Sequence, residues 1–289
     1  MEWINAIVQG LLLGGLYALF ATGLSLMFGI MRLVNIAHGD FIVLAAYVGL
    51  VVVEGTGLHP LLSLFVVVPV MGLLGYVLQR YLLNRTLGDD LLPPLLVTFG
   101  LSVIIQNLLL EVFSADTRRL QAGSMETISL EIVPGLTVGL FPLLIFLAAL
   151  VIIFGLQWLF YHTDQGRAFR ATSDDPETAQ MMGISINHIF ALAMALAMGV
   201  VAFAGVFLAI RTNFDPAVGP ARLLYGFEAV IIGGLGSIAG TLAGGMILGV
   251  AQAVGAQLDP GWQILAGHLV FLVILVIRPR GLFPKMVDG

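Results

Sequence analysis

A few ionisable and amide side chains stand inside long apolar runs of this sequence. Asn35, His38 and Asp40 share the stretch "NIAHGDF", and the others are isolated or occur in pairs. A buried polar group without a partner costs several kcal/mol, roughly, so each must pair, line a polar passage or hold a ligand. The candidates for such a passage are Asn35, His38, Asp40, Gln106, Asn107 and Glu228, with His268 as a further ionisable group.

The spacing of these residues does not favour catalysis or metal binding. The five histidines are scattered, cysteine is absent, and no serine nucleophile has a base beside it. No G-x-x-x-x-G-K-[ST] stretch occurs, so the chain has no phosphate-binding loop for ATP. No basic run suggests nucleic acid as a partner. We therefore expect no catalytic residue, no metal site and no enzymatic activity in this chain.

Composition places these groups in a membrane. Hydrophobic residues make up 59% of the chain and charged residues only 10%, whereas soluble domains carry about 25% charged residues. The mean hydropathy of +1.05 is typical of an integral membrane protein. In that setting an ionisable residue within an apolar segment is a candidate for a translocation path, and the lipid bilayer is the first expected partner.

Charge-free runs define the elements that must position these residues. We predict an all-α polytopic membrane protein, a single domain over 1–289, with about eight transmembrane helices. The runs are 3–31, 41–53, 60–79, 91–110, 132–163, 189–210, 229–258 and 260–277. The stretch "IIGGLGSIAGTLAGG" within 223–258 either breaks a helix or forms a re-entrant turn. Its glycines, Gly233, Gly234, Gly236 and Gly240, favour close helix packing.

The distribution of Lys and Arg orients the helices. Eight basic residues fall on one side: Arg32, Arg80, Arg85, Arg167, Arg170, Arg278, Arg280 and Lys285. Four fall on the other: Arg118, Arg119, Arg211 and Arg222. This bias predicts a multi-pass protein with its N-terminus outside and its C-terminus in the cytoplasm. The loop 114–136 is then extracytoplasmic, with a β-hairpin in "ETISLEIVPG", and the loop 162–187 is cytoplasmic.

The cytoplasmic loop contains the signals of a short helix. Asp175 is suited to cap its N-terminus, Pro176 to be its first residue, and Gly183 to end it in the left-handed conformation. Glu177 adds a favourable negative charge to the first turn. A helix over 176–182 is too short to be stable alone, so it must dock. It either packs on its own domain or couples the membrane helices to another subunit through Ala179, Met181 and Met182.

Two readings also remain open for the polar groups. The stretch "NIAHGDF" is either a turn near the inner end of the first two spans or a break lining the path. In the first case Asp40 caps the helix 41–53, or His38 and Asp40 satisfy one another. Glu228 either pairs with Arg222 or Arg211 or contributes to the path.

The loop "GRAFRATSDDPETAQMMGI" resembles the coupling motif of ABC importer permeases, in particular the branched-chain amino acid family (LivH/LivM type). Three other stretches resemble the same family in the same order: "GLYALFATGLSLMFGIMRLVNIAHGDFIVLAAYVG", "AVIIGGLGSIAGTLAGGMILG" and "IRPRGLFPK". The resemblance covers essentially the whole chain and favours the LivH branch. Glu228 departs from the family pattern, where a neutral or basic residue is expected, and this leaves the substrate open.

The resemblance implies a permease subunit of an ATP-driven importer in the bacterial inner membrane. Branched-chain or other amino acids are the first expected substrate, and urea or short-chain amides the second. The implied partners are a second permease (a LivM-type paralogue), two cytoplasmic ATP-binding subunits that hold ATP and Mg, and an extracytoplasmic substrate-binding protein. The implied ATPase-coupling residues are Gly166, Arg167, Arg170, Asp175, Pro176, Glu177, Ala179, Met182 and Gly183.

A self-sufficient secondary transporter or channel is the alternative from a different class. It would need membrane charges for ion coupling, and the capped helix of the cytoplasmic loop argues against it.

Overall fold

Eight long apolar helices form the membrane part of the protein. The computed structural model describes residues 1–88 and 90–283. Within those residues, eight helices are long and apolar enough to cross a membrane, so the predicted all-α polytopic fold with eight such helices is confirmed. They are α1 (Glu2–Met31), α2 (His38–Thr56), α3 (Leu64–Tyr81), α4 (Leu92–Phe113), α5 (Leu140–His162), α8 (Ile186–Arg211), α10 (Ile238–Leu258) and α11 (Gln263–Ile277). The span of α3 extends through a 3₁₀ turn to Arg85, and that of α11 begins with a 3₁₀ turn at Pro260.

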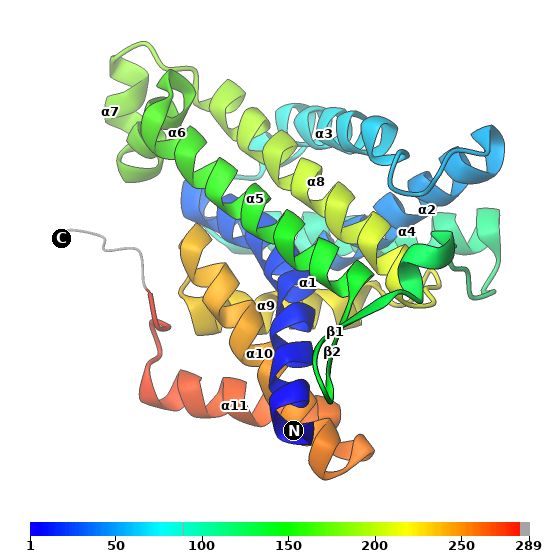
Figure 1. Cartoon of the computed structure of the whole chain (residues 1–289). Helices are drawn as coiled ribbons and strands as arrows, with labels where there is room; N and C mark the ends of the chain where they lie inside the picture. Colours follow the sequence, from blue (N-terminus) through cyan, green and yellow to red (C-terminus); the bar gives the residue numbers. More distant parts are fainter. Residues whose placement is uncertain (89, 284–289) are drawn as a thin grey trace.

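The two ends of the helix bundle are marked by different loops (Figure 1). At the hairpin end, the strands β1 (Ser129–Val133) and β2 (Leu136–Gly139) pair in antiparallel fashion beside the start of α1. Gln9 Nε2 donates a hydrogen bond of 2.6 Å to the carbonyl of Thr137 there. At the opposite end, α5 leads into α6 (Asp164–Asp174) and α7 (Pro176–Met181). We call this the α6 end.

The predicted β-hairpin is confirmed, but its second strand lies beyond the stretch "ETISLEIVPG". Pro134 and Gly135 form the turn, with Gly135 in the left-handed region at φ 86°. The strand β2 takes residues that the charge-free run 132–163 had assigned to a helix, so that α5 begins only at Leu140. Three single-turn 3₁₀ helices complete the description: η1 (Leu83–Arg85), η2 (Gly123–Glu126) and η3 (Pro260–Trp262).

An additional helix, α9 (Gly219–Gly233), lies between α8 and α10. At 15 residues it is shorter than a full span and is not among the eight candidate spans. The N-terminal helix starts at the hairpin end, whereas Phe283 lines a cavity with Ser173 of α6. The two ends of the described chain therefore lie toward opposite ends of the bundle.

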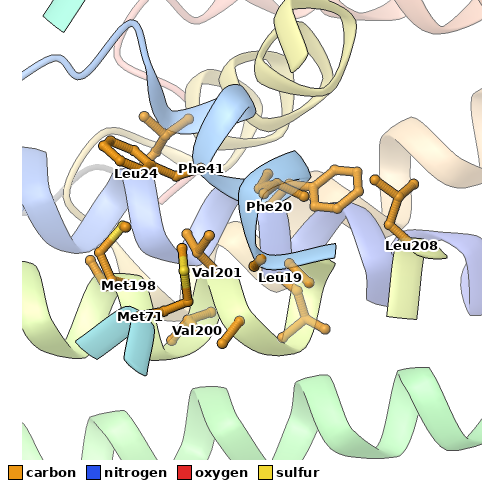
Figure 2. Packing of buried hydrophobic residues seen from close by; sticks show 14 of the residues in the cluster. Leu19, Phe20, Leu24, Phe41, Met71, Met198, Val200, Val201 and Leu208 are labelled. Carbon is orange, nitrogen blue, oxygen red and sulfur yellow. The ribbon is translucent and has the colours of Figure 1, made fainter. Parts of the chain in front are cut away.

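The core lies where α1 and α8 cross at the centre of the bundle. Both helices are buried along most of their length, whereas α4, α5 and α11 are largely exposed. Figure 2 shows Leu19 of α1 close to Val201 of α8, both of them buried. This arrangement leaves the outer helices exposed, and it makes α1 and α8 the central frame for the polar groups.

Glycine backbones bring α1 and α10 into direct contact. Gly10 and Gly14 on α1 face Gly245 and Gly249 on α10, and a Cβ at any of the four would meet the backbone of the other helix. Both pairs have the four-residue spacing that places small residues on one helix face. In a membrane, where lipid removes most of the hydrophobic driving force between helices, such close approach supplies van der Waals contact.

The glycine-rich stretch breaks the chain between α9 and α10, as one of the two sequence-based alternatives expected. Gly234 and Gly236 occupy the turn with φ values of 106° and 80°, which residues other than glycine rarely adopt. Gly233 and Gly240 face one another across it, so that a Cβ on either would meet the other's backbone. The turn therefore needs two glycines for its conformation and two more for its tight closure.

Candidate functional site

The stretch "NIAHGDF" lies deep in the bundle and not at its inner boundary, which corrects the sequence-based placement. His38 Nε2 hydrogen-bonds the carbonyl of Phe20 at 2.8 Å. Phe20 lies about 16 Å along the helix axis from the end of α1 at Met31. After α1 ends, the chain therefore turns back and runs alongside it over 32–37 before α2 begins. Irregular backbone is tolerated at that depth only inside protein or beside water.

Local hydrogen bonds hold this irregular segment. Asn35 Oδ1 accepts a hydrogen bond of 3.0 Å from the amide of Ala37, and Asn35 is fully buried. The hydroxyl of Thr98 on α4 accepts a bond of 3.3 Å from the amide of Ile36. Asp40 does not cap the start of α2, which corrects one of the sequence-based alternatives. The N-cap is Ala37, without a side-chain bond, and Asp40 already lies within the helix.

Asp40 pairs with α4 instead of with His38. Gln106 Nε2 donates to Asp40 Oδ1 at 3.0 Å and to the Ser102 hydroxyl at 3.1 Å. Asp40 is almost completely buried. The expectation that His38 and Asp40 satisfy one another is therefore wrong. Asn107 does not join this group, because it is exposed and its amide donates to the carbonyl of Val103 on its own helix.

The starts of α2 and α9 meet at this point. A Cβ at Gly39 would collide with the backbone of Gly219 and Leu223, and a Cβ at Gly219 would meet Asp40. The Asp40 carboxylate thus lies in the first turn of α2 and against the first residue of α9. Helix N-termini carry partial positive charge, so one carboxylate here stabilises both. Sequence reasoning missed Gly219, because only the three-dimensional arrangement brings "HGD" and "VGP" together.

Glu228 belongs to a second polar cluster, in which its partner is His268 and not Arg211 or Arg222. His268 Nδ1 on α11 hydrogen-bonds Glu228 Oε1 on α9, and Glu228 is 2% exposed. Nearby, the Tyr17 hydroxyl of α1 donates to Gln252 Oε1 of α10 at 2.6 Å. These contacts join four helices. Tyr17 and Gln252 gave no signal in sequence, because they are 235 residues apart.

We expect removal of the His268 side chain to reduce the stability of the protein more than neutralisation of Glu228 does. The substitution His268→Ala leaves the buried Glu228 side chain without a partner, at a cost of about 1–3 kcal/mol. The substitution Glu228→Gln retains an acceptor for the imidazole N–H. Thermal denaturation of the purified protein in detergent should therefore show a larger decrease in the midpoint temperature for His268→Ala than for Glu228→Gln. Equal midpoints for the two variants would contradict this account of the pair.

The cytoplasmic loop of the sequence-based prediction contains the expected short helix and a second helix that was not predicted. The helix α7 begins at Pro176 and ends at Met181, one residue earlier than expected. Asp175 caps it as predicted, and Gly183 adopts φ 86° just beyond it. The additional helix α6 precedes it and packs through Phe169 and Thr172. Its mostly polar sequence hid it from a reading based on apolar runs.

The apolar residues of α7 do not share one face. Ala179 is 4% exposed and packs inward. Met181 and Met182 are 80% and 79% exposed and point away from the described part of the chain. Glu177 is also exposed. Methionine side chains adapt easily to a partner surface. Of the three apolar residues named from sequence, only the two methionines are therefore free to contact another subunit.

The loop residues nearer α5 are bound to their own chain. Gly166 allows the tight corner between α5 and α6, since a Cβ there would strike the backbone of Leu159 and Phe160. Arg170 donates to the carbonyl of Phe160 and lies 5.1 Å above the centre of the Tyr161 ring. Arg167 pairs with Asp164 on the exposed surface. These three residues therefore shape the loop from within.

We expect the N-cap of α7 to depend on pH. Hydrogen bonds from the Thr178 hydroxyl and amide lower the pKa of Asp175, because they favour its charged form. The cap is complete at neutral pH, and its stabilisation is lost as the pH falls through the lowered pKa. The protection factors for amide hydrogen exchange of 177–182, corrected for the intrinsic exchange rate at each pH, should fall in that acid range. The substitution Asp175→Asn keeps a capping side chain but should abolish this pH dependence, and a persistent dependence would contradict the assignment.

A continuous set of contacts links the loop to the membrane helices. Ser173 of α6 donates a hydrogen bond of 2.6 Å to the carbonyl of Gly29 in the last turns of α1. A Cβ at Gly29 would press on Gly236 in the turn between α9 and α10. A cavity of about 600 Å³ opens beside these contacts, lined by α1, α5, α6 and the same turn. The helix α6 therefore contacts α1 directly, and α1 in turn contacts the turn between α9 and α10.

The eight helices long enough to cross a membrane, the two interrupted segments and the short exposed helix are features of a multi-pass membrane protein. A family model described as the permease component of branched-chain amino acid transport systems matches residues 6–277, and the chain belongs to this family. BraD of Pseudomonas aeruginosa, a high-affinity branched-chain amino acid permease protein, is 29% identical and covers 98% of this chain and 96% of its own length.

A second relative and one solved structure match over nearly the whole chain as well. LivH of Escherichia coli (strain K12), another branched-chain amino acid permease protein, is 26% identical over 99% of this chain and 96% of its own length. Among solved structures, PsaBC from Streptococcus pneumoniae matches with a TM-score of 0.53 and 16% identity, covering 96% of each chain. That likeness concerns the fold alone. The family predicted from the four sequence stretches is confirmed.

Proposed function

We propose that this permease subunit carries branched-chain or other amino acids into the bacterial cytoplasm, driven by ATP hydrolysis in partner subunits. The observation that carries the proposal is the capped helix α7, which lies between two membrane passes and exposes Met181 and Met182. The chain lacks a phosphate-binding loop of its own. Energy must therefore arrive through a mechanical contact, and ATP and Mg belong to the partners.

In this proposal, α7 docks in a groove of an ATP-binding subunit with its two methionines. Movement of α7 passes to α6 and then, through the Ser173–Gly29 hydrogen bond, to α1 and the glycine turn. Gly233, Gly234, Gly236 and Gly240 then act as the flexible joint of the broken segment. Interfaces and packed elements with two arrangements convert a small local shift into a larger movement.

The path for substrate follows the two interrupted segments. The irregular stretches 32–37 and 212–218 run into the bundle from opposite ends, and the helices α2 and α9 begin where they meet. We place Asn35, His38, Asp40 and Gln106 along this path, with Asn107 at its exposed edge. Discontinuous helices with N-termini at depth are a recurring way to place polar groups near the bilayer centre.

The remaining assignments follow the family. The N-terminus is outside and the C-terminus is cytoplasmic, so that α6 and α7 face the ATP-binding subunits. The basic residues support this orientation, since Arg80 and Arg278 lie at the ends of α3 and α11 and Arg167 lies in the first turn of α6. Lys285, counted on the same side, lies outside the described residues. A LivM-type paralogue supplies the second permease, and a binding protein delivers the substrate.

Reconstitution tests the proposal. The chain is purified with the permease, ATP-binding and binding-protein subunits encoded beside its gene, and uptake of radiolabelled leucine into proteoliposomes is measured with and without ATP. We expect uptake only with ATP and with substrate-loaded binding protein. Leucine uptake without any ATP-binding subunit would contradict the proposal in favour of a secondary transporter. Uptake of urea but not leucine would contradict the substrate assignment.

A further inference from the structure

The last described residues of the chain return to the glycine turn between α9 and α10. The amide of Leu282 donates a hydrogen bond of 2.9 Å to the carbonyl of Ile232. The amide of Phe283 donates one of 3.0 Å to the carbonyl of Gly233. These carbonyls belong to the last two residues of α9, where a helix leaves its acceptors without intrahelical donors. We call residues 281–283 the C-terminal strap.

Gly281 holds the strap against the turn by direct backbone contact. It is buried and adopts φ 78°, in the left-handed region that favours glycine. A Cβ on Gly281 would collide with the carbonyl of Ile231 and with the backbone of Gly234. The next residue, Leu282, is partly buried and packs against the hydrophobic core. Gly281 is therefore needed both for its conformation and for the space that a side chain would occupy.

The strap joins the C-terminal ends of α9 and α11. The two helices already meet within their lengths, where His268 of α11 pairs with Glu228 of α9. The strap adds a second connection at the glycine turn, which Gly29 of α1 approaches through Gly236. Phe283, at the end of the strap, is 54% exposed and lines the cavity beside α6. The turn is thus held by α1 and by the strap.

The strap has the properties of a contact that can open and close. Its polar attachment consists of two backbone hydrogen bonds, and its last described residue is exposed. Segments with few buried contacts open locally while the rest of a protein stays folded. Detachment would free the carbonyls at the end of α9 and remove one of the contacts that hold the turn. The membrane helices themselves would keep their packing.

We propose that the C-terminal strap holds the glycine turn in the arrangement seen in this structure and detaches when ATP hydrolysis drives the transport cycle. The inference rests on the proposed function and adds a regulatory element to it. While the strap is attached, the turn keeps one arrangement until the ATP-binding subunits act. When the strap is lost, the turn changes arrangement without a substrate-loaded binding protein, so that ATP is hydrolysed without uptake.

A first experiment follows the strap by chemical accessibility. The chain contains no cysteine, so Leu282→Cys places a single, partly buried thiol in the strap. In the assembled importer, the rate of maleimide modification of this chain is measured by mass spectrometry, without nucleotide and after trapping with ATP and vanadate. We expect modification to be about fivefold faster in the trapped state, because the thiol becomes exposed. Equal rates in the two states would overturn the proposal.

A second experiment measures leucine uptake per ATP hydrolysed. Gly281→Ala should raise hydrolysis in the absence of binding protein and lower this ratio by about tenfold, the equivalent of one or two backbone hydrogen bonds. The matched control is Gly57→Ala at the end of α2, because Gly57 has φ 68° and a Cβ there would meet nothing within 4 Å. The control carries the same backbone strain without the collision and should keep a normal ratio. A normal ratio in assembled Gly281→Ala would overturn the proposal.

A further pair of variants isolates one hydrogen bond and does not depend on the assembly of Gly281→Ala. Phe283→Pro removes the amide that binds Gly233, whereas Phe283→Ala keeps it, and both lose the exposed ring. We expect only Phe283→Pro to lower uptake per ATP and to speed modification of Leu282→Cys without nucleotide. Identical behaviour of the two variants would contradict a role for the backbone contact.

The outcomes separate this inference from the function on which it rests. Faster modification of Leu282→Cys after trapping, with no leucine uptake by the unmodified importer, would refute the proposed substrate and leave the strap standing. Normal leucine uptake, with equal modification rates in the two states, would overturn the strap alone. A lower thermal midpoint for Gly281→Ala with normal uptake per ATP would assign the strap to stability only and would also overturn its role in the cycle.

Discussion

Replacing Gly39 with alanine is expected to abolish uptake, although it adds only one methyl group. The added Cβ would collide with the backbone of Gly219 and Leu223, which is part of α9 and cannot rotate away as a side chain can. Relief requires that the starts of α2 and α9 separate. Overpacking of this kind costs about 1–3 kcal/mol in a well-packed core, and here it also displaces Asp40 from the α9 N-terminus.

The measurement is ATP-driven leucine uptake at matched protein levels, with thermal denaturation in detergent recorded in parallel. A matched control is Gly155→Ala on α5, since Gly155 is also helical and a Cβ there would meet nothing within 4 Å. The control should keep normal uptake and stability. Normal uptake by Gly39→Ala would mean that the contact between the two helix starts is not needed for transport.

The double substitution Met181→Asp and Met182→Asp is expected to detach the ATP-binding subunits. Both side chains are about four-fifths exposed, so their replacement leaves the fold of the chain intact. Two carboxylates in a buried apolar contact would have to be desolvated without partners. We expect at least a tenfold loss of co-purified ATP-binding subunit, with a corresponding loss of uptake. The conservative pair Met181→Leu and Met182→Leu should retain most of the binding.

This test replaces one that sequence alone would have suggested. A charge at Ala179 would damage α7 itself, because Ala179 packs inward, and a loss of function there would not identify the docking surface. If the methionine variant keeps its ATP-binding subunits and its uptake, α7 is not the contact, and the proposed route of energy into the membrane helices is wrong.

Much of the fold could be predicted because its signals are local. A charge-free run of about twenty residues is sufficient to predict a span, and Asp175, Pro176 and Gly183 determine the ends of α7 over a few residues. The helix α6 escaped notice because it is polar and short. The helix α9 was not predicted as a separate element because, at 15 residues, it lacks the length of a span.

The candidate site was harder to predict from sequence, because its contacts join residues that are far apart in the chain. Glu228 pairs with a residue forty positions away, and Gln106 binds a residue 66 positions away. Sequence correctly flagged Asp40, His38 and Glu228 as unusual, but it assigned the wrong partners to all three. Polar residues in an apolar run indicate that each has a partner in the folded protein. Which partner it is depends on how the helices cross, and periodicity does not encode that.

The short helix α9 has a consequence for how the protein is made. At about 22 Å it cannot cover the hydrocarbon core, and the non-helical segment before it would leave unpaired backbone in lipid. A nascent chain that has reached Gly233 therefore cannot release α9 into the bilayer as it releases α8. The segment must wait until α10 has emerged to close the glycine turn and α11 has brought His268 to Glu228. The last third of the chain is thus expected to enter the membrane as one cooperative unit.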